Sequence, residues 1–372
     1  MRASSTTPAL YLDPPSHHFL NDRLFDAETN PYTGENILAP YIALRDHFVS
    51  RGVSVHTADR LLADPDAPSG IYVSFGRTED IKRLVRRKDV VLSAFFALEC
   101  PIVEPRLYES LPELAPHFRR ILSWSDAPSL ERFTGTPIVV EHFSWPQSFD
   151  RVHDGLWDNR DRKFLVMINS NKLPRLYWQE LYTQRLAAVA FFHQFGEIDL
   201  YGPNWGRMPN RVGRTWVPTT AFRIQQQLWK VKQRIRPNPL YRAAAQAHRG
   251  RTRSKARTLG SYRFAICFEN MVLKGWMTEK IFDCFYAGTV PVYWGAPDVL
   301  DWVPADCFID MRQFSGFAEL RDHLHSLTTA DVDNYREAAR AYVASPRFDP
   351  FRKGAFVDLF RRIFHEDTGI SA

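Results

Sequence analysis

The sequence predicts an α/β protein with two domains, each built on a mostly parallel β-sheet. A chain of 372 residues is too long for one ordinary hydrophobic core, which favours two domains. Hydrophobic residues make up 45% of the chain and aromatic residues 14%, a composition that is typical of well-packed globular proteins. Short apolar runs alternate with helix-like segments, and this alternation indicates strands joined by helices in a parallel sheet.

The first series of alternating segments lies within residues 1–160. It consists of a strand over residues 9–12, a helix over 37–51, a strand over 71–75, a helix that begins at Thr78 and runs to Lys88, and a strongly apolar strand over 89–97. Each strand is short and is followed by a segment long enough for a crossover helix. We therefore expect residues 1–160 to form a Rossmann-like domain of their own.

The second series lies within residues 161–345 and predicts a second Rossmann-like domain. Its expected elements are a strand over residues 164–169, a helix over 177–195, strands over 198–201 and 263–268, a helix that begins at Thr278, and a strand over 290–294. Residues 346–372 end the chain with an amphipathic helix. Its apolar side favours packing on protein, and contact with a membrane surface is the alternative.

Residues 262–295 form the stretch that carries most of the chemistry. Thr278 is a good N-cap for the helix that follows, and Gly288 suits its C-terminal end. Helix N-termini that follow a strand in an open α/β sheet lie where such folds bind ligands. Glu279 and Lys280 place a carboxylate and an ammonium group there. A sugar nucleotide needs both, because its diphosphate attracts cations and its hydroxyl groups donate to anions.

The same residues carry a resemblance to a known family. The runs CFEN, MTEK and AGTVPVYWG resemble the signature of the α-1,3/4-fucosyltransferases, glycosyltransferase family 10. Order, spacing and residue types agree over about 35 contiguous residues, which makes the resemblance specific. Two positions depart from the family pattern: Met271 stands where a Ser is common, and Trp276 stands where a Tyr is usual. The structural alternative is an ordinary Rossmann-like unit whose acidic first turn is favoured by the helix dipole.

The resemblance implies a GT-B fold, in which two Rossmann-like domains face a cleft and a C-terminal helix crosses back onto the first domain. Residues 1–160 would then bind the acceptor, residues 161–345 the nucleotide-sugar donor, and residues 346–372 would pack on the N-terminal domain. The implied reaction is inverting transfer of L-fucose from GDP-fucose to a hydroxyl group of a glycan, with an α-1,3 or α-1,4 linkage.

A general base for the acceptor hydroxyl is expected at the carboxyl end of a first-domain strand. Glu99 directly follows the apolar strand over residues 89–97. The family has a Glu-Ser-Pro-like element with a proposed catalytic Glu, and Glu99-Cys100-Pro101 resembles it. From the residues alone Glu104, Glu141 and Asp13 remain candidates beside Glu99. The predicted catalytic residues are Glu99 and Glu279.

The donor site is expected to combine cations, hydrogen-bonding groups and one aromatic ring. Lys280 would neutralise the diphosphate, and the resemblance implies the same role for Arg185, since family members carry an Arg in this helix that pairs with the donor phosphates. Ser170 and Asn171 would donate to the diphosphate, and Arg223 is an additional contact. Asn270 and Glu279 would accept from sugar and ribose hydroxyls, and Trp276 would offer a stacking surface. The complete set of predicted donor-binding residues is Arg185, Lys280, Asn270, Trp276, Ser170, Asn171, Thr278 and Arg223.

No metal ion and no cofactor beyond the GDP-fucose donor are expected. Metal-dependent glycosyltransferases of the GT-A type hold their ion through an Asp-x-Asp pair at a strand end. Two stretches fit this spacing, Asp64-Pro65-Asp66 in a proline-rich loop and Asp331-Val332-Asp333 at the start of a helix. An Asp at a helix start commonly acts as a cap. Cationic side chains are therefore expected to replace the metal.

The charge is distributed unevenly along the chain, whose net charge is +6. Residues 200–268 contain fifteen Lys and Arg but no Asp or Glu. Three functions suit such a stretch: binding an anionic donor or acceptor, contact with a membrane surface or a lipid-linked acceptor, and nucleic-acid binding. A solvated basic face is the structural alternative. Nucleic acid is not an expected partner, because no reader motif is present.

Four cysteines without CxxC spacing favour reduced thiols, and the first twelve residues do not resemble a signal peptide. These observations predict a cytoplasmic protein, with peripheral contact at the inner face of the membrane left open. The resemblance implies a bacterial source, because no membrane anchor is expected. Two other functions remain as alternatives. One is the same chemistry with another nucleotide sugar in lipopolysaccharide or surface-glycan synthesis, and the other is a non-catalytic glycan- or membrane-binding protein.

Overall fold

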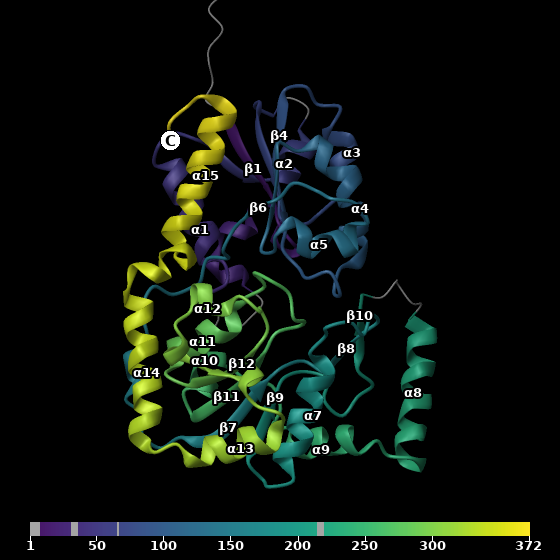
Figure 1. The fold of residues 1–372 in the computed structure, drawn as a ribbon. Coiled ribbons are helices and arrows are strands. Elements are labelled where there is room, and N and C mark those ends of the chain that lie inside the picture. The colour runs from purple at the N-terminus through teal and green to yellow at the C-terminus, as the bar shows by residue number, and fades with distance from the viewer. Residues whose placement is uncertain (1–7, 31–35, 65–66, 214–218) are drawn as a thin grey trace, which may run out of the picture. The chain divides into compact units, whose positions relative to one another are not determined.

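The computed structural model describes residues 8–30, 36–64, 67–213 and 219–372 (Figure 1). The chain divides into two compact units. Unit 1 comprises Met1–Pro101, Pro105–Asp150 and Asp349–Ala372, and unit 2 comprises Ile102–Glu104 and Arg151–Phe348. The sequence places the corresponding domain boundaries after residues 160 and 345.

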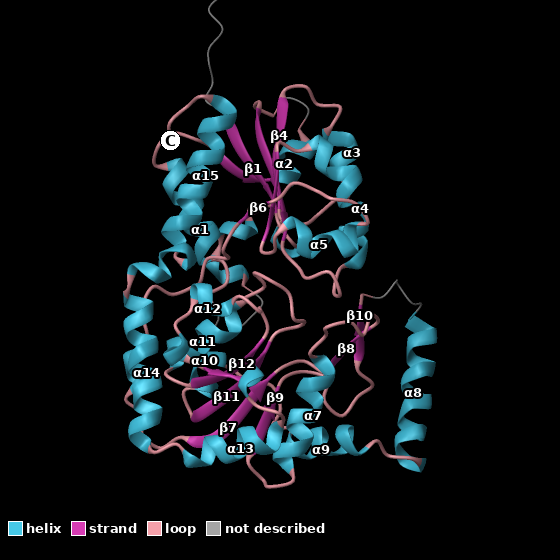
Figure 2. Ribbon diagram, viewed as in Figure 1, coloured by secondary structure: helices cyan, strands magenta, loops and turns pink. Residues whose placement is uncertain are grey.

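Unit 1 is built on a parallel six-stranded sheet in the order β2-β1-β3-β4-β5-β6 (Figure 2). The strands are β1 (Ala9–Asp13), β2 (Val55–Thr57), β3 (Gly70–Ser74), β4 (Val90–Ala97), β5 (Arg120–Ser123) and β6 (Glu141–His142). The helices are α1 (Ala39–Val49), α2 (Ala58–Ala63), α3 (Ile81–Leu84), α4 (Pro105–Leu114), α5 (Ala127–Thr134) and α15 (Lys353–Thr368). Short 3-10 segments are η1 (His17–Phe19), η2 (Arg23–Phe25), η3 (Ala27–Thr29) and η4 (Ala115–His117), and η7 (Pro346–Phe351) leads into α15.

Unit 2 is built on a parallel five-stranded sheet in the order β13-β12-β11-β7-β9. Its strands are β7 (Lys163–Ile168), β9 (Ile198–Tyr201), β11 (Tyr262–Phe268), β12 (Val290–Trp294) and β13 (Ile309–Asp310), and β8 (Lys172–Pro174) pairs separately with β10 (Asn210–Val212). The helices are α6 (Asp154–Trp157), α7 (Tyr182–His193), α8 (Thr219–Ile235), α9 (Pro239–Ala247), α10 (Lys255–Leu259), α11 (Glu279–Ala287), α12 (Val299–Trp302), α13 (Phe317–Ser326) and α14 (Thr329–Ala344), with 3-10 segments η5 (Ala305–Cys307) and η6 (Met311–Gln313).

Two expected helices are shorter than their sequence pattern indicates. The helix expected from Thr78 to Lys88 is reduced to α3. Its basic residues repeat at four-residue spacing, and like charges at that spacing destabilise a helix. The helix expected from residue 177 begins only at Tyr182, because Gln179 has a positive φ of 50°, which a right-handed helix does not accommodate.

The order of the strands in unit 2 marks a ligand-binding position. The chain leaves β7 toward β9 on one side of the sheet, whereas it leaves β11 toward β12 on the other side. β7 and β11 are neighbours, so the connections diverge between them. In open α/β sheets a crevice forms at such a switch point, beyond the carboxyl ends of the strands. The segments after Ile168 and Phe268 are therefore the place to look for a site.

Helix α15 packs its apolar face into the core of unit 1. Phe360 stacks on Phe96 of β4, with ring centroids 5.8 Å apart, and Phe364 meets Phe48 of α1 edge-on at 5.3 Å. Arg120 of β5 pairs with Asp367 near the helix end at 3.0 Å. The apolar face of α15 is therefore covered by protein and is not available to a membrane. None of the helices in the described parts of the chain has the length and apolar character that a bilayer span requires.

We expect Phe360→Ala to lower the free energy of unfolding of unit 1 by about 3–5 kcal/mol, because it leaves a cavity in the core. Denaturant titration followed by circular dichroism measures the change. Arg361→Ala, on the exposed side of the same helix, is the matched control and should change stability by less than about 0.5 kcal/mol. Equal effects of the two substitutions would contradict the core role of α15.

Candidate functional site

The carboxyl end of β11 carries a fully buried carboxylate, that of Glu269. Its Oε1 accepts a hydrogen bond from the Thr278 backbone N–H at 2.8 Å, and its Oε2 accepts one from the Thr278 hydroxyl at 2.8 Å. The Lys280 ammonium donates to the same Oε2 at 3.0 Å. A buried charge is tolerated when it is paired and hydrogen-bonded in this way. Glu269 therefore ties the end of β11 to the start of α11.

Gly295, directly after β12, leaves room for this carboxylate. A Cβ atom at position 295 would lie 2.5 Å from Cγ of Glu269 and 2.5 Å from the Tyr293 hydroxyl oxygen. Neither neighbour moves easily, because both side chains are buried. The absence of a side chain at Gly295 is thus a condition for the position of Glu269.

Lys280 holds a positive charge at the N-terminus of α11. Its ammonium lies 2.7 Å from the Thr278 hydroxyl and 4.0 Å from Oε1 of Glu279, and 17% of its side chain is exposed. Burial alone would lower the pKa of Lys280, but Glu269 and Glu279 outweigh it and raise the pKa above its usual value. The partial positive charge of the helix N-terminus adds to that of the ammonium group. This position suits an anion.

Thr278 occupies the predicted N-cap position, and Gly288 ends α11 in the left-handed conformation, as predicted. The capping interaction itself is different from the expected one. The Thr278 side chain makes no cap hydrogen bond to the helix. Its hydroxyl bonds to Glu269 and Lys280 instead, so Thr278 serves the buried ion pair.

Glu279 is the exposed acid of the site, with 48% of its side chain accessible. Its Oε1 accepts from the Lys255 ammonium at 3.0 Å. Desolvation alone would raise the pKa of Glu279, but Lys255 and Lys280 outweigh it and hold the pKa well below its usual value. Glu279 is therefore an ionised, half-exposed hydrogen-bond acceptor. Sequence reasoning missed Lys255, which reaches the site from the acid-free stretch over residues 200–268.

Arg185 and Asn270 are brought together beneath the same edge of the sheet. The buried guanidinium of Arg185 donates to the Phe268 carbonyl from Nε at 3.0 Å and from Nη2 at 2.6 Å. Nη2 also donates to Oδ1 of Asn270 at 3.1 Å. Arg185 thus completes the hydrogen bonding at the end of β11 and fixes the Asn270 side chain. The predicted contact of Arg185 with donor phosphates stays a prediction.

Two expected donor contacts need correction. Trp276 is only 2% exposed, so its ring offers no open face for stacking, because the connection before α11 turns the ring into the core. The buried amide of Asn171 donates to the Asn204 carbonyl at 3.1 Å and to the Arg207 carbonyl at 2.9 Å. Both of its amide hydrogens are therefore committed to the loop after β9, and none is left for phosphate.

The remaining two predicted donor residues lie at different places. Ser170 is half-buried just beyond the carboxyl end of β7, next to the switch point, where a hydrogen bond to a ligand is feasible. Arg223 is exposed on α8, which Figure 1 shows well apart from α11. Arg223 is thus not part of the cluster around Lys280.

The predicted base Glu99 lies just beyond the carboxyl end of β4 and is half-buried. Its Oε1 accepts from the Cys100 backbone N–H at 2.8 Å, and its carbonyl accepts from the Tyr108 hydroxyl at 2.6 Å. Among the described residues Oε2 has no hydrogen-bond partner. The backbone contacts fix the direction of the carboxylate and leave one oxygen for a proton.

The other candidate bases are less suitable. Asp13, at the end of β1, is buried, accepts from the Tyr72 hydroxyl at 2.6 Å and pairs with Arg77 at 3.4 Å, so its oxygens are already committed. Glu141 is held by Arg362 at 2.8 Å. Glu104 is exposed in the segment before α4.

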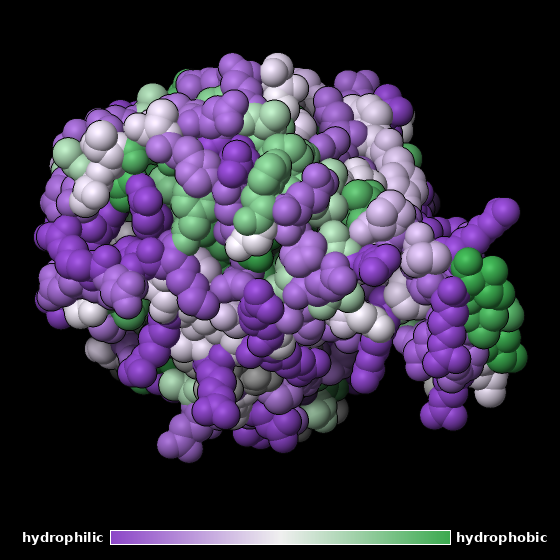
Figure 3. Space-filling model, turned by 90° about the horizontal axis from the view of Figure 1, so that it is seen from below, coloured by the Kyte–Doolittle hydropathy of each residue, from purple (hydrophilic) through white to green (hydrophobic). Residues whose placement is uncertain are grey.

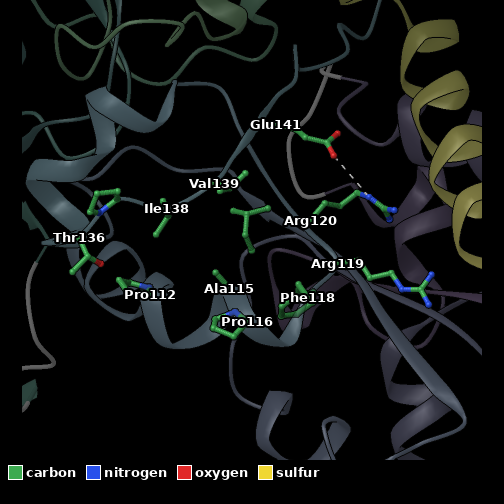
Figure 4. Close-up of a pocket in the computed structure, with 12 residues that line it drawn as sticks. Pro112, Ala115, Pro116, Phe118, Arg119, Arg120, Thr136, Ile138, Val139 and Glu141 are labelled. Atoms are coloured by element: carbon green, nitrogen blue, oxygen red, sulfur yellow. Dashed lines mark ion pairs between the residues drawn. The ribbon is translucent and has the colours of Figure 1, made fainter.

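Unit 1 contains a cavity of about 380 Å³ (Figure 4). Arg119 and Arg120 line it at the amino end of β5, together with Pro112, Val139 and Glu141. Glu99 follows the carboxyl end of the neighbouring strand β4. Because ligands of open α/β sheets bind at the carboxyl ends, this cavity is not the expected site.

Of the two Asp-x-Asp stretches, only Asp331-Val332-Asp333 lies wholly within the described residues. The Asp331 side chain caps α14 together with Thr328, and Asp333 pairs with Arg160 and Arg336. Asp64 is described, but Pro65 and Asp66 lie outside the described residues. Within the described ranges no three His, Cys, Asp or Glu side chains gather in a way that would hold a metal ion.

Comparison with known families confirms the resemblance in the region of this cluster. Residues 225–340 match the family model described as glycosyltransferase family 10 (fucosyltransferase) C-term. The matched range contains Glu269, Asn270, Thr278, Glu279 and Lys280. It covers under a third of the chain, and Glu99 lies outside it.

Individual relatives match over similar short stretches. The α-(1,3)-fucosyltransferase FucT of Helicobacter pylori is 36% identical over 77 residues, which are 21% of this chain and 16% of the relative. The GDP-fucose protein O-fucosyltransferase 3 of Xenopus laevis is 39% identical over 75 residues, 20% of this chain and 16% of the relative. The chain thus spans about a sixth of the length of these relatives.

A solved structure confirms the expected fold. The α-glucosyltransferase in complex with UDP superposes with a TM-score of 0.51 at 13% identity, and the match covers 95% of this chain and 98% of that one. At this identity the likeness concerns the fold alone. Together with the two parallel sheets it confirms the GT-B class predicted from the sequence.

We expect Lys280→Ala to destabilise unit 2 by about 3–5 kcal/mol, because it leaves the Glu269 carboxylate buried without its cation. The double substitution Glu269→Gln/Lys280→Met removes both charges and should restore most of the lost stability. Denaturant unfolding of the three proteins measures this. A Lys280→Ala protein within 1 kcal/mol of wild type would rule out the structural role of the pair.

Proposed function

We propose, given that residues 225–340 carry a family 10 C-terminal domain, that this protein is a fucosyltransferase. It would transfer L-fucose from GDP-fucose to a hydroxyl group of a glycan, forming an α-1,3 or α-1,4 linkage. The observation that carries the proposal is the cluster at the N-terminus of α11. There a charged Lys280, fixed by buried Glu269, lies beside the half-exposed, ionised Glu279.

The cluster suits the two halves of a sugar nucleotide. The Lys280 ammonium and the N-terminus of α11 would hold the diphosphate, whose negative charge they complement. Glu279 would accept hydrogen bonds from ribose or fucose hydroxyls, since its carboxylate is ionised and half-exposed. Asn270, oriented by Arg185, and Ser170 would add further polar contacts from the neighbouring strand ends.

The proposed reaction is a single in-line displacement. The acceptor oxygen forms a bond to the anomeric carbon of fucose while the bond from that carbon to the diphosphate oxygen breaks. The electron pair of that bond leaves with GDP, and Lys280 stabilises the charge that develops there. The acceptor proton passes to Glu99, whose Oε2 is the oxygen left for it. Attack opposite to the leaving group inverts the configuration, and no metal ion takes part.

The names of the relatives support GDP-fucose as the donor more strongly than they support any particular acceptor. One relative is an α-(1,3)-fucosyltransferase and the other is a GDP-fucose protein O-fucosyltransferase, so they share fucose and differ in what receives it. The family match covers residues of unit 2 only, and the acceptor would be selected by unit 1. Use of another nucleotide sugar and a non-catalytic binding role remain the alternatives.

We expect GDP to bind in the presence of excess chelator, with the affinity measured by calorimetry. The stability-matched variant Glu269→Gln/Lys280→Met should bind GDP about 1.5–3 kcal/mol more weakly, because a charge-assisted contact is lost. Lys232→Met on α8, which removes one positive charge away from the cluster, is the control and should bind normally. Binding that requires added Mn²⁺ would refute the metal-independent proposal.

We expect Glu99→Gln to reduce turnover by about two to four orders of magnitude and to remove the acidic limb of the pH–rate profile. Its affinity for GDP should be unchanged, because the proposed role of Glu99 is to accept the proton of the acceptor. Glu104→Gln, an exposed glutamate nearby, serves as the control. Fucose transfer at the wild-type rate by Glu99→Gln would place the base elsewhere. If wild type and variant both bind glycans and neither transfers fucose, the result would favour a non-catalytic glycan-binding protein.

A further inference from the structure

Helix α8 turns its most apolar side chains toward solvent. Ile224, Leu228, Val231 and Ile235 are each 50–75% exposed. They follow one another at spacings of four, three and four residues, so they fall within a sector of about 60° on the helix. We call these four residues the apolar stripe. Figure 3 shows it as a hydrophobic patch on the protruding part of unit 2.

The opposite face of α8 carries the side chains that the rest of unit 2 partly covers. Phe222, Gln226, Trp229 and Gln233 are half-buried and share this face. The Trp229 ring stands edge-on against Tyr241 of α9, with centroids 5.9 Å apart. A surface helix normally buries its more apolar side. In α8 two of the four packing residues are glutamines, while the apolar stripe is left outside and thus suits a further partner.

Cations flank the apolar stripe on both sides. At helical spacing Lys232 and Arg236 lie along one flank, and Arg223, Lys230 and Arg234 along the other. No Asp or Glu occurs anywhere in residues 200–268 to neutralise them. A second copy of the helix against the stripe would bring the two sets of cations together, which is unfavourable. The partner must therefore be apolar and negatively charged at once.

A basic, aromatic hollow of about 540 Å³ lies between α8 and α9. Its lining includes Trp229 and Tyr241 together with Lys230, Arg234 and Arg242. Two of its cations, Lys230 and Arg234, are also on the flank of the apolar stripe. A phosphate group that meets this flank thus has a space lined by positive charge beside it.

We propose that α8 docks this protein on an anionic lipid bilayer. The apolar stripe enters the boundary between headgroups and acyl chains, and the flanking cations contact lipid phosphates. An apolar face with Lys and Arg on either side is the pattern of helices that lie in a membrane interface. This docking goes beyond fucosyl transfer and does not depend on it.

The test is co-sedimentation of the full chain with vesicles of phosphatidylcholine alone or mixed with phosphatidylglycerol. Wild type should bind the mixed vesicles at ~0.05 M salt and bind them weakly at ~0.5 M, because salt screens the cations. Leu228→Gln/Val231→Gln should reduce the partition coefficient about tenfold or more. Lys232→Gln/Arg234→Gln should reduce it at low salt only. Val49→Gln, an exposed apolar residue of α1, is the matched control.

A second readout locates the contact. A polarity-sensitive dye on Leu228→Cys should shift to shorter wavelength with anionic vesicles, and the same dye on Val49→Cys should not. No binding of wild type to anionic vesicles at low salt overturns the proposal, as does binding that the α8 substitutions leave unchanged. Light scattering without lipid tests the alternative partner, a second copy of the protein. A dimer that Leu228→Gln/Val231→Gln dissociates would assign the apolar stripe to contact between two copies.

Discussion

The site of unit 2 depends on one buried charge. The Glu269 carboxylate has no contact with solvent, and the Thr278 amide and hydroxyl and the Lys280 ammonium together offset the cost of removing it from water. These partners belong to the first residues of α11 and its cap, whereas Glu269 extends β11. The pair therefore fixes where the helix begins relative to the sheet. Gly295, which leaves space for the carboxylate, adds the end of β12 to the same arrangement.

The other groups of the site follow from that arrangement. With its position set, Lys280 has a raised pKa, and Lys255 of α10 together with Lys280 lowers the pKa of Glu279. On the other side of β11 the Arg185 guanidinium bonds the Phe268 carbonyl and orients Asn270. Cations and acceptors are thus gathered at one edge of the sheet, where the strand connections diverge.

The sequence predicted the parallel sheets, the cap position of Thr278 and the glycine end of α11, because these depend on local periodicity and turn chemistry. The sequence did not single out Glu269, because nothing distinguishes it from other polar residues that follow a strand. Its role becomes visible only in the structure, where β11 and α11 lie side by side. Trp276 and Asn171 were misjudged for the same reason, since tertiary packing decides which polar or aromatic groups remain accessible. The outward stripe of α8 also needed the structure, because a helical pattern does not tell which face is buried.

The return of α15 to unit 1 has a consequence for how the protein is made. Unit 2 is almost continuous in sequence, whereas unit 1 is completed only by residues after Asp349. During synthesis unit 2 can therefore finish folding while unit 1 still waits, with the apolar surface around Phe96 and Phe48 uncovered. Until α15 leaves the ribosome, unit 1 is the unfinished unit, although most of its residues are synthesised before unit 2. It is then the part most in need of a chaperone and most exposed to aggregation.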